Sequence, residues 1–316
     1  MMYHIDTDMG VDDGLALLLA DRVLASVAAL STIFGNVPVD VATRNALIFR
    51  ALLGHTQSWP ILQGAARAVD GTLRNAIQVH GEDGMGGAIH AVDPALLAQI
   101  SEQHVARLAD PPPARSGKVT LIGLGPATNI PDLVAWYGKS AVARIVLMSG
   151  VFFDNGNITP MAEFNAFCDP HALRATLGLG IPVTLVPLDV CRKVVLPRAM
   201  IAAFGQAGTT LLTALLCDSH LKYMDFYRSS DAIDGCFPHD SIAVLAAMMP
   251  DRFYRLSGTV EVDCAGARRG RTSIALSGRT QVEIVTGGDL KWVREVLAGV
   301  LAHAAPAEEG RKALLF

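Results

Sequence analysis

The strongest constraint on the fold is the alternation of short apolar runs with amphipathic stretches along most of the chain. The apolar runs, about five to eight residues long and separated by Gly and Pro, have the length of buried strands, and the stretches between them have the period of helices. This alternation predicts an α/β fold, with an open, mostly parallel sheet flanked by helices in the manner of a Rossmann fold. We expect strands at residues 3–6, 27–34, 119–124, 145–148 and 183–188, and helices at 13–24 and 40–53.

The pattern changes near the C-terminus. Residues 259–263, 272–276 and 281–285 are strand-like and follow one another without intervening helices, which predicts a small antiparallel appendage before a closing helix at 290–302. The basic run 268–271 is predicted to be a turn between two of these strands. Residues 109–117 contain three consecutive prolines, but strands resume directly after them. We expect this segment to be a surface loop, and residues 1–316 to form a single domain.

Charge and hydropathy exclude several classes of partner. The net charge is −4, with Lys and Arg scattered, so the sequence lacks the basic face that binding a nucleic-acid backbone requires. No apolar segment approaches the roughly 20 residues of a membrane-spanning helix, and the N-terminus lacks the pattern of a signal peptide. The five cysteines are widely spaced and without a C-x-x-C pair, which is typical of small core residues rather than of disulfides or a zinc site. We therefore expect a cytoplasmic protein.

Four aspartates lie within eight residues, between the first strand and the first helix. Capping of the helix by acidic residues accounts for Asp12 or Asp13, but not for Asp6 and Asp8 as well. Carboxylates this close repel one another, so the turn is either fully solvated or holds a cation. Gly10 permits the sharp turn, and ligands that are all oxygen favour a hard ion, calcium or magnesium, over zinc.

This aspartate run resembles the N-terminal signature D-x-D-P-G-x-D-D of the inosine-uridine type nucleoside hydrolases. Three further segments match the same family in order, and the pair His239-Asp240 lies where the family places its distal metal ligand. The three segments are Gly35-Asn36-Val37, Gly125-Pro126-Ala127-Thr128-Asn129 and residues 157–165. The resemblance therefore extends from residue 3 to about residue 245, and five ordered motifs are far more specific than any one of them.

The resemblance implies a role for each matched residue. A calcium ion would be held by Asp8, Asp13, Asp240 and the backbone carbonyl of Thr128. The ribose would be bound by Asp12, Asn36, Met148, Asn157, Glu163 and Asn165. His80 and His239 match histidines near the base, and Tyr223 and Tyr227 could lie along a helix edge against it. From the residues themselves, Glu163 and Asn165 are two apart and would project the same way from an extended segment.

Each of these residues also has a purely structural interpretation. An Asn directly after a strand is commonly a turn residue, which applies to Asn36. A lone histidine such as His80 is commonly a structural group, whereas His239 beside Asp240 at a predicted helix start is harder to explain that way. Tyrosines four apart, such as Tyr223 and Tyr227, are equally typical of helix packing.

The chain departs from the family pattern at four positions: Met9, Phe34, Ser149 and Ser241. None of these changes removes a metal ligand or a sugar contact. Met9 and Phe34 could reshape the pocket wall, which would alter base preference more than activity.

The implied reaction is hydrolysis of the N-glycosidic bond of a ribonucleoside to free base and ribose. It needs a water delivered to the anomeric carbon and a proton delivered to the leaving base. We expect calcium to hold and acidify the water and Asp8 to take its proton. His239 is the candidate acid, because an imidazole with a pKa near neutrality can donate a proton at working pH. Tyr223 or Tyr227 could assist or replace it.

Two other functions are weighed against this one. A haloacid dehalogenase-type phosphatase also places D-x-D-x-[TV] after its first strand, but here Gly10 stands where that motif needs Thr or Val. A nucleoside-binding sensor without turnover would keep the pocket. The presence of all the proposed ligands and of the base Asp8 argues against such a loss of activity.

The glycines at 84–87 do not follow a strand, so neither NAD nor ATP is expected. By resemblance, the protein is expected to form a homo-oligomer, a dimer or a tetramer.

Overall fold

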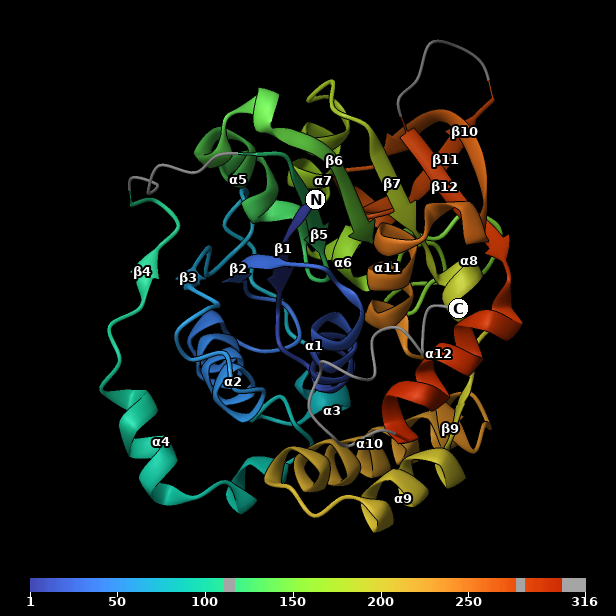
Figure 1. Ribbon diagram of the computed structural model, residues 1–316. Coiled ribbons are helices and arrows are strands. Elements are labelled where there is room, and N and C mark those ends of the chain that lie inside the picture. Colours follow the sequence, from blue (N-terminus) through green and yellow to red (C-terminus); the bar gives the residue numbers. More distant parts are fainter. Residues whose placement is uncertain (111–116, 277–281, 303–316) are drawn as a thin grey trace.

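The computed structural model describes residues 1–110, 117–276 and 282–302. These residues form a ten-stranded sheet in the order β11-β10-β12-β7-β6-β5-β1-β2-β3-β4, in which every neighbouring pair from β12 to β4 is parallel (Figure 1). The predicted fold class is confirmed. The strands of the sheet are β1 (Met2–Thr7), β2 (Val27–Thr32), β3 (Ile61–Gln63), β4 (Ala106–Arg107), β5 (Val119–Gly123), β6 (Val142–Met148), β7 (Val183–Val186), β10 (Phe253–Val262), β11 (Thr272–Ala275) and β12 (Val282–Gly288).

A separate antiparallel pair, β8 (Leu196–Pro197) and β9 (Gly235–Cys236), lies outside this sheet. The helices are α1 (Val11–Val23), α2 (Val39–Leu52), α3 (Ile77–His80), α4 (Pro94–Ser101), α5 (Ile130–Tyr137), α6 (Phe164–Cys168), α7 (Pro170–Leu177), α8 (Leu188–Cys191), α9 (Arg198–Ala207), α10 (Leu211–Ser230), α11 (His239–Met248) and α12 (Leu290–Ala302). Short 3₁₀ turns lie at Ala88–Ala91, Ala127–Asn129, Lys139–Ala141, Pro250–Arg252 and Gly266–Arg268.

The central strands are apolar along their whole length because helices cover both faces of the sheet. Successive side chains of a strand point to opposite faces. On β5, Leu121 accordingly packs in the core with α5 and α7, whereas the next residue, Ile122, packs in the core with α1 and α11. A strand buried on both faces loses the polar alternation of a half-exposed strand, and this explains the continuous apolar runs of the sequence.

The predicted antiparallel appendage is an extension of the main sheet. β10 is antiparallel to both β11 and β12, but β12 is parallel to β7 and so continues the parallel part of the sheet. The expectation of a separate appendage is corrected in this respect, because the pairing of β12 with β7 is a long-range contact that local periodicity does not encode. β10 begins at Phe253, six residues earlier than predicted, and residue 281 lies outside the described residues.

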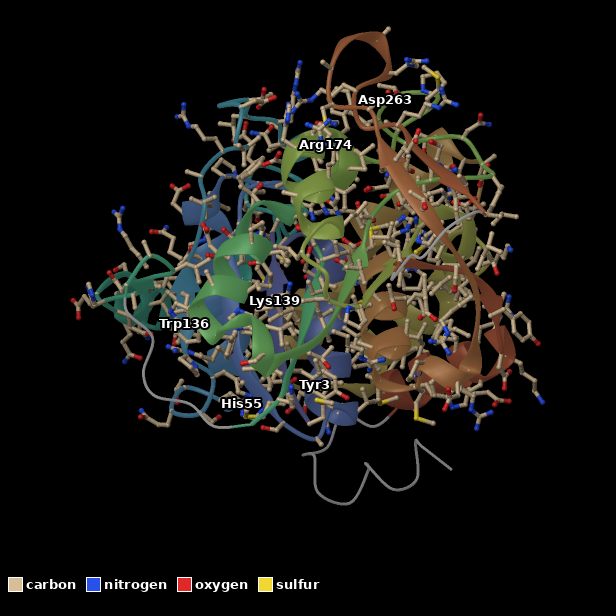
Figure 2. All side chains as sticks on the ribbon, turned by 90° about the horizontal axis from the view of Figure 1, so that it is seen from above. Tyr3, His55, Trp136, Lys139, Arg174 and Asp263 are labelled. Atoms are coloured by element: carbon tan, nitrogen blue, oxygen red, sulfur yellow. The ribbon has the colours of Figure 1, made fainter. Side chains whose placement is uncertain are left out.

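The predicted turn at residues 268–271 does connect β10 to β11. Asp263, at the start of this connection, and Arg174 of α7 are labelled in Figure 2, which shows the connection and α7 at the same end of the molecule. α7 packs against β10 there. Residues 111–116 of the predicted surface loop lie outside the described residues.

The other local predictions agree with the structure to within a few residues. The closing helix has its predicted bounds, Leu290–Ala302, and α1 begins two residues before its prediction, at Val11. All five cysteines are free, and all but Cys264 are buried, so those four are core residues. Among the described helices, none combines the length and the apolar character needed to cross a bilayer.

The order of the strands places a topological switch point at β1, because the chain leaves β1 toward β2 and later returns to β5 on its other side. In open α/β sheets, ligands bind beyond the carboxyl ends of the strands at such a point. The aspartate run begins within β1 and continues past its carboxyl end, and Asn36 and Leu124 follow β2 and β5 at the same edge of the sheet.

Candidate active site

The turn from β1 into α1 is held by the carboxylate of Asp13. One oxygen accepts the hydroxyl of Thr7 at 2.5 Å and the other accepts the amide of Gly10 at 2.7 Å, as in a capping box. Met9 adopts a left-handed φ of 44°, and a Cβ on Gly10 would lie 2.6 Å from Nδ1 of His80. The close approach of the Asn36 and His80 side chains therefore requires glycine at position 10.

Three carboxylates meet at this edge of the sheet although one of them is distant in sequence. Asp12, Asp13 and Asp240 are all buried, and each offers an oxygen within 4.8 Å of the others. Asp240 is the second residue of α11. Burial raises the pKa of Asp12 and of Asp240 well above the usual range, and the neighbouring carboxylates raise both further.

This cluster fits a hard divalent cation. Oδ1 of Asp12 is buried and finds no hydrogen-bond donor among the described residues. Carboxylates that are buried, close together and incompletely hydrogen-bonded are stabilised by a bound cation, and a donor set made of oxygen atoms suits calcium or magnesium. Of the other predicted metal ligands, Asp8 shares the side-chain amide of Asn36 with Asp13. The hydroxyl of Thr128 donates to Asp169 at 2.8 Å, and the role of its backbone carbonyl stays a prediction.

Asp8 is oriented by Asn36, which follows β2. The backbone amide of Asn36 donates to Oδ2 of Asp8 at 2.7 Å, and its side-chain amide donates to Oδ1 at 3.0 Å and to Oδ2 of Asp13 at 3.1 Å. A Cβ on Gly35 would overlap the carboxylate of Asp8, so glycine is needed for this close approach. Burial, followed by the charge of Asp13, raises the pKa of Asp8 well above its usual range. Asn36 is therefore more than a turn residue.

A cavity of about 290 Å³ opens beside the carboxylates. Of the fourteen residues that the sequence predicted for the site, all but Asp8, Asp13 and Thr128 line it. The lining residues among them are Asp12, Asn36, His80, Met148, Asn157, Glu163, Asn165, Tyr223, Tyr227, His239 and Asp240. Residues spread over most of the chain thus converge on one pocket.

Glu163 and Asn165 line the cavity, but the extended segment predicted for them is wrong. The carboxylate of Glu163 accepts the amides of Asn165 at 2.7 Å and Ala166 at 2.9 Å, which starts helix α6 at Phe164. Gly150 donates to the same carboxylate at 2.9 Å. Burial raises the pKa of Glu163 to about 7 against the opposing effect of these hydrogen bonds. The side-chain amide of Asn165 donates to the carbonyl of Leu124 at 2.7 Å.

Another part of the cavity wall is a row of three hydrogen-bonded side chains. Tyr223 and Tyr227, one turn apart on α10, have their hydroxyl oxygens 3.1 Å apart. The hydroxyl of Tyr227 lies 3.0 Å from Nε2 of His239, the first residue of α11. Nδ1 of His239 is buried without a partner among the described residues. The tyrosines therefore pack in the core and also face the cavity.

Both histidines of the cavity are neutral at physiological pH. Burial lowers the pKa of His239 to about 3 and that of His80 to about 3. The expectation of a near-neutral pKa for His239 is corrected, because desolvation disfavours the charged imidazolium. Nδ1 of His80 accepts the amide of Val11 at 3.1 Å, so the neutral ring carries its proton on Nε2.

Further residues line the cavity that sequence reasoning missed, among them Gln78, Arg192, Phe226, Ser230, Asp231 and Phe237. Arg192 follows α8, just beyond the carboxyl end of β7, so its position after a strand could have suggested it. Two residues expected to reshape the wall, Met9 and Phe34, are not among the lining residues. Both are fully buried, Phe34 in a small cluster with Ile33 and Ala68.

The fold and this pocket define a class of protein, the α/β proteins that bind a ligand among buried carboxylates at the carboxyl edge of a parallel sheet. A sequence model of the family described as inosine-uridine preferring nucleoside hydrolase matches residues 3–295. The chain belongs to this family.

Individual relatives agree with this assignment. The probable uridine nucleosidase 2 of Oryza sativa subsp. japonica is 32% identical over 275 residues, covering 85% of this chain and 80% of the relative. The non-specific ribonucleoside hydrolase RihC of Escherichia coli is 33% identical over 313 residues, covering 93% and 97%. The purine-preferring ribonucleoside hydrolase from Gardnerella vaginalis shares the fold, with a TM-score of 0.80 at 24% identity over 96% of this chain and 98% of that one.

Proposed function

We propose that this protein hydrolyses the N-glycosidic bond of ribonucleosides to free base and ribose. The observation that carries the proposal is the convergence, around one cavity, of a carboxylate cluster, a set of amides and carboxylates, and the Tyr223–Tyr227–His239 row. Hydrolysis of a glycoside needs activated water on one side of the sugar and a proton for the leaving group on the other. The names of the relatives, uridine nucleosidase and ribonucleoside hydrolase, support the same substrate class.

We propose Asp8, Asp13, Asp240 and the carbonyl of Thr128 as the ligands of a calcium ion. The carboxylate cluster supports this assignment and adds Asp12 as an adjacent donor. When bound, the ion would compensate the buried negative charge and make water more acidic. Asp8 is the proposed base. Asn36 occupies two of its acceptor positions, and a carboxylate with about four such positions still has room for a proton.

The ribose is proposed to lie against Asp12, Asn36, Met148, Asn157, Glu163 and Asn165. Carboxylates accept hydrogen bonds from sugar hydroxyls, and amides both donate and accept. Glu163 and Asn165 are held by backbone groups from three different segments, so their geometry exists before the substrate arrives. Such preorganisation favours the distorted sugar of the transition state.

The base is proposed to lie near His80, Tyr223 and Tyr227, with His239 as the proton donor. Because His239 is neutral, it donates from whichever ring nitrogen carries hydrogen. If the hydroxyl of Tyr227 donates to Nε2, the hydrogen lies on Nδ1, which has no partner among the described residues. Tyr227 can then pass its proton to Nε2 as His239 gives the Nδ1 proton to the leaving base. The phenolate left on Tyr227 accepts the hydroxyl of Tyr223 and takes a proton from water once the products leave.

Family membership argues against the phosphatase alternative and leaves the sensor as the rival to be tested.

We further propose that the protein is cytoplasmic, that residues 1–316 form one domain, and that it assembles as a homodimer or homotetramer. The free, mostly buried cysteines support a reducing compartment.

The test is release of base and ribose from uridine, cytidine, inosine, adenosine and deoxyinosine, before chelation, after it, and after return of calcium. Calcium-dependent ribose release from any of them supports the proposal and identifies the preferred base. Nucleoside binding by calorimetry without release from any would favour the sensor. Restoration by magnesium but not by calcium would keep the reaction and overturn the choice of ion.

A further inference from the structure

A side chain of the short helix α8 is hydrogen-bonded to the loop that carries part of the proposed ribose site. We define this loop, residues 149–163, as the segment between β6 and α6. The buried carboxylate of Asp189 accepts the amide of Phe152 at 2.9 Å and the amide of Phe153 at 2.6 Å. Two consecutive amides of the loop are thus bound by one side chain of α8.

The residue directly after α8 binds the next part of the loop. Nη1 of Arg192 donates to the carbonyl of Asn155 at 2.5 Å and to the carboxylate of Asp154 at 3.2 Å, and Nη2 lies 3.5 Å from the carbonyl of Gly156. A carboxylate that accepts amides and a guanidinium that binds oxygen atoms therefore hold residues 152–156 without interruption. The planar guanidinium can reach several oxygens at once, which a lysine cannot do.

The clamped stretch leads directly into Asn157. Gly156, Asn157 and Ile158 line the cavity. The tip of the loop is folded on itself, since the amide of Asn157 donates to the carbonyl of Ala162 at 3.2 Å and its side chain accepts the amide of Phe164 at 2.8 Å. These bonds shape the tip. Asp189 and Arg192 tie residues 152–156 to the body of the protein, and Val151 and Ala162 near the ends of the loop are bonded to Thr272 and Arg271. These contacts matter because the middle of the loop is largely exposed to solvent: Phe153, for example, is 66% exposed.

α8 and the residues that follow it are bonded to the loop itself, to the sheet and to the closing helix. The amide of Leu188 donates to the carbonyl of Gly150 at 3.0 Å. The ammonium group of Lys193 donates to the carbonyl of Thr286 in β12 at 2.8 Å, and Arg294 of α12 donates to the carbonyl of Lys193 at 3.0 Å. A binding group is held most accurately when its supporting residues lie on such rigid elements.

We propose that Asp189 and Arg192 are positioning residues that set the place of loop 149–163, and through it of Asn157, for binding of the ribose. This inference rests on the proposed function, because it assigns Asn157 to the sugar. Arg192 also lines the cavity and could touch a ligand itself, whereas Asp189 does not line it. The hydrogen bonds of the Asp189 carboxylate go to Phe152 and Phe153, so we expect its effect on sugar binding to act through the loop.

The experiment compares Asp189→Ala, Arg192→Ala and Arg192→Lys with Arg255→Ala. Arg255 is a matched control, because its side chain is 31% exposed against 22% for Arg192 and it also binds a carboxylate, that of Glu283, but it lies outside the cavity. For each protein, kcat and KM are measured with uridine and inosine, and inhibition constants with D-ribose and with the free bases. Hydrogen exchange of the amides of residues 152–157 reports on the loop without reference to activity.

We expect Asp189→Ala and Arg192→Ala to raise KM and the inhibition constant of D-ribose by about tenfold, with inhibition by the free bases unchanged and exchange accelerated in the loop. Arg192→Lys should recover part of the loss, because lysine keeps the positive charge that pairs with Asp154 but cannot reach several oxygens at once as the guanidinium does. Arg255→Ala should match the wild type.

The proposal is overturned if Asp189→Ala leaves ribose inhibition unchanged, even if Arg192→Ala weakens it, because Arg192 would then act by direct contact. It is equally overturned if ribose and base inhibition weaken together. If the wild-type protein hydrolyses no nucleoside, the proposed function fails separately. D-ribose binding by calorimetry and loop exchange in the same variants then decide whether the clamp exists.

Discussion

The hydroxyl of Tyr227 lies 3.0 Å from Nε2 of His239, and the hydroxyl of Tyr223 lies 3.1 Å from that of Tyr227. The two tyrosines come from α10 and the histidine from α11, and all three are buried. The proposed proton donor is therefore the end of a hydrogen-bonded row rather than an isolated imidazole, and each member can be tested.

His239→Ala is expected to lower kcat by about 10²- to 10⁴-fold, the usual contribution of a general acid. Tyr227→Phe keeps the ring and removes only the hydroxyl, so a smaller loss of about tenfold in kcat with little change in KM is expected. Steady-state kinetics with inosine and uridine measure both. Tyr254→Phe is the matched control, because Tyr254 is 71% exposed on β10. Unchanged turnover of both substrates by His239→Ala would remove His239 from the mechanism.

Asn36→Ala is expected to lower kcat/KM by about 10²-fold, because an ångström-scale displacement of a reacting group has costs of this size. The variant removes the amide that donates to both Asp8 and Asp13, while the backbone donor to Asp8 stays. Calcium affinity, measured by calorimetry, should fall in parallel. Wild-type kinetics together with wild-type affinity would show that the hydrogen bonds of the Asn36 side chain contribute neither to catalysis nor to metal binding.

Calcium is expected to stabilise the folded protein, since an ion that binds the native state only adds about 2.7 kcal/mol at 100 times its dissociation constant. After chelation, Tm should fall, and it should rise again with added calcium in a concentration-dependent manner. Asp240→Asn should reduce this rise, because Asp240 supplies an oxygen of the cluster. A Tm that is indifferent to chelation and to calcium, in protein shown to be metal-free, would contradict the proposed site.

The pair Arg269–Asp70 should make stability depend on pH. Nη1 of Arg269 donates to the carboxylate of Asp70 at 2.5 Å, and the same guanidinium donates to the carbonyls of Phe167 and Cys168 at the end of α6. The hydrogen bond from Arg269 holds the pKa of Asp70 well below its usual range. A carboxyl group with a lowered folded-state pKa stabilises the protein above its unfolded pKa of about 3.9, and this contribution is lost as the pH falls below that value.

Asp70→Asn is therefore expected to lower the free energy of unfolding at pH 7 by at most about 1 kcal/mol, since the pair is partly exposed. The difference from the wild type should shrink as the pH falls below about 4. Denaturant unfolding at several pH values measures this. Asp263→Asn, which breaks a longer and more exposed pair with Arg268 in the same connection, should have a smaller effect. An Asp70→Asn difference that is constant with pH would refute the assignment.

Much of the fold follows from local features of the sequence. The strands at β1, β2, β5, β6 and β7 and the helices α1, α2 and α12 were predictable, because apolar period and turn residues act over a few neighbouring positions. The aspartate turn was predictable for the same reason. Its carboxylates, its glycine and the following helix lie within one short stretch, and so do the donors to Asp13 from Thr7 and Gly10.

The tertiary structure decided what depends on distant groups and on burial. Asp240 joins Asp12 and Asp13 although more than two hundred residues separate them, and β12 continues the parallel sheet beside β7. The low pKa of His239 comes from desolvation, which no sequence window records. Glu163 starts a helix rather than lying in an extended segment, because its carboxylate accepts the first amides of α6 while it is bound by Gly150. The sequence by itself therefore determined which chemical groups the site contains, and only packing between distant segments determined how they meet and in which protonation state.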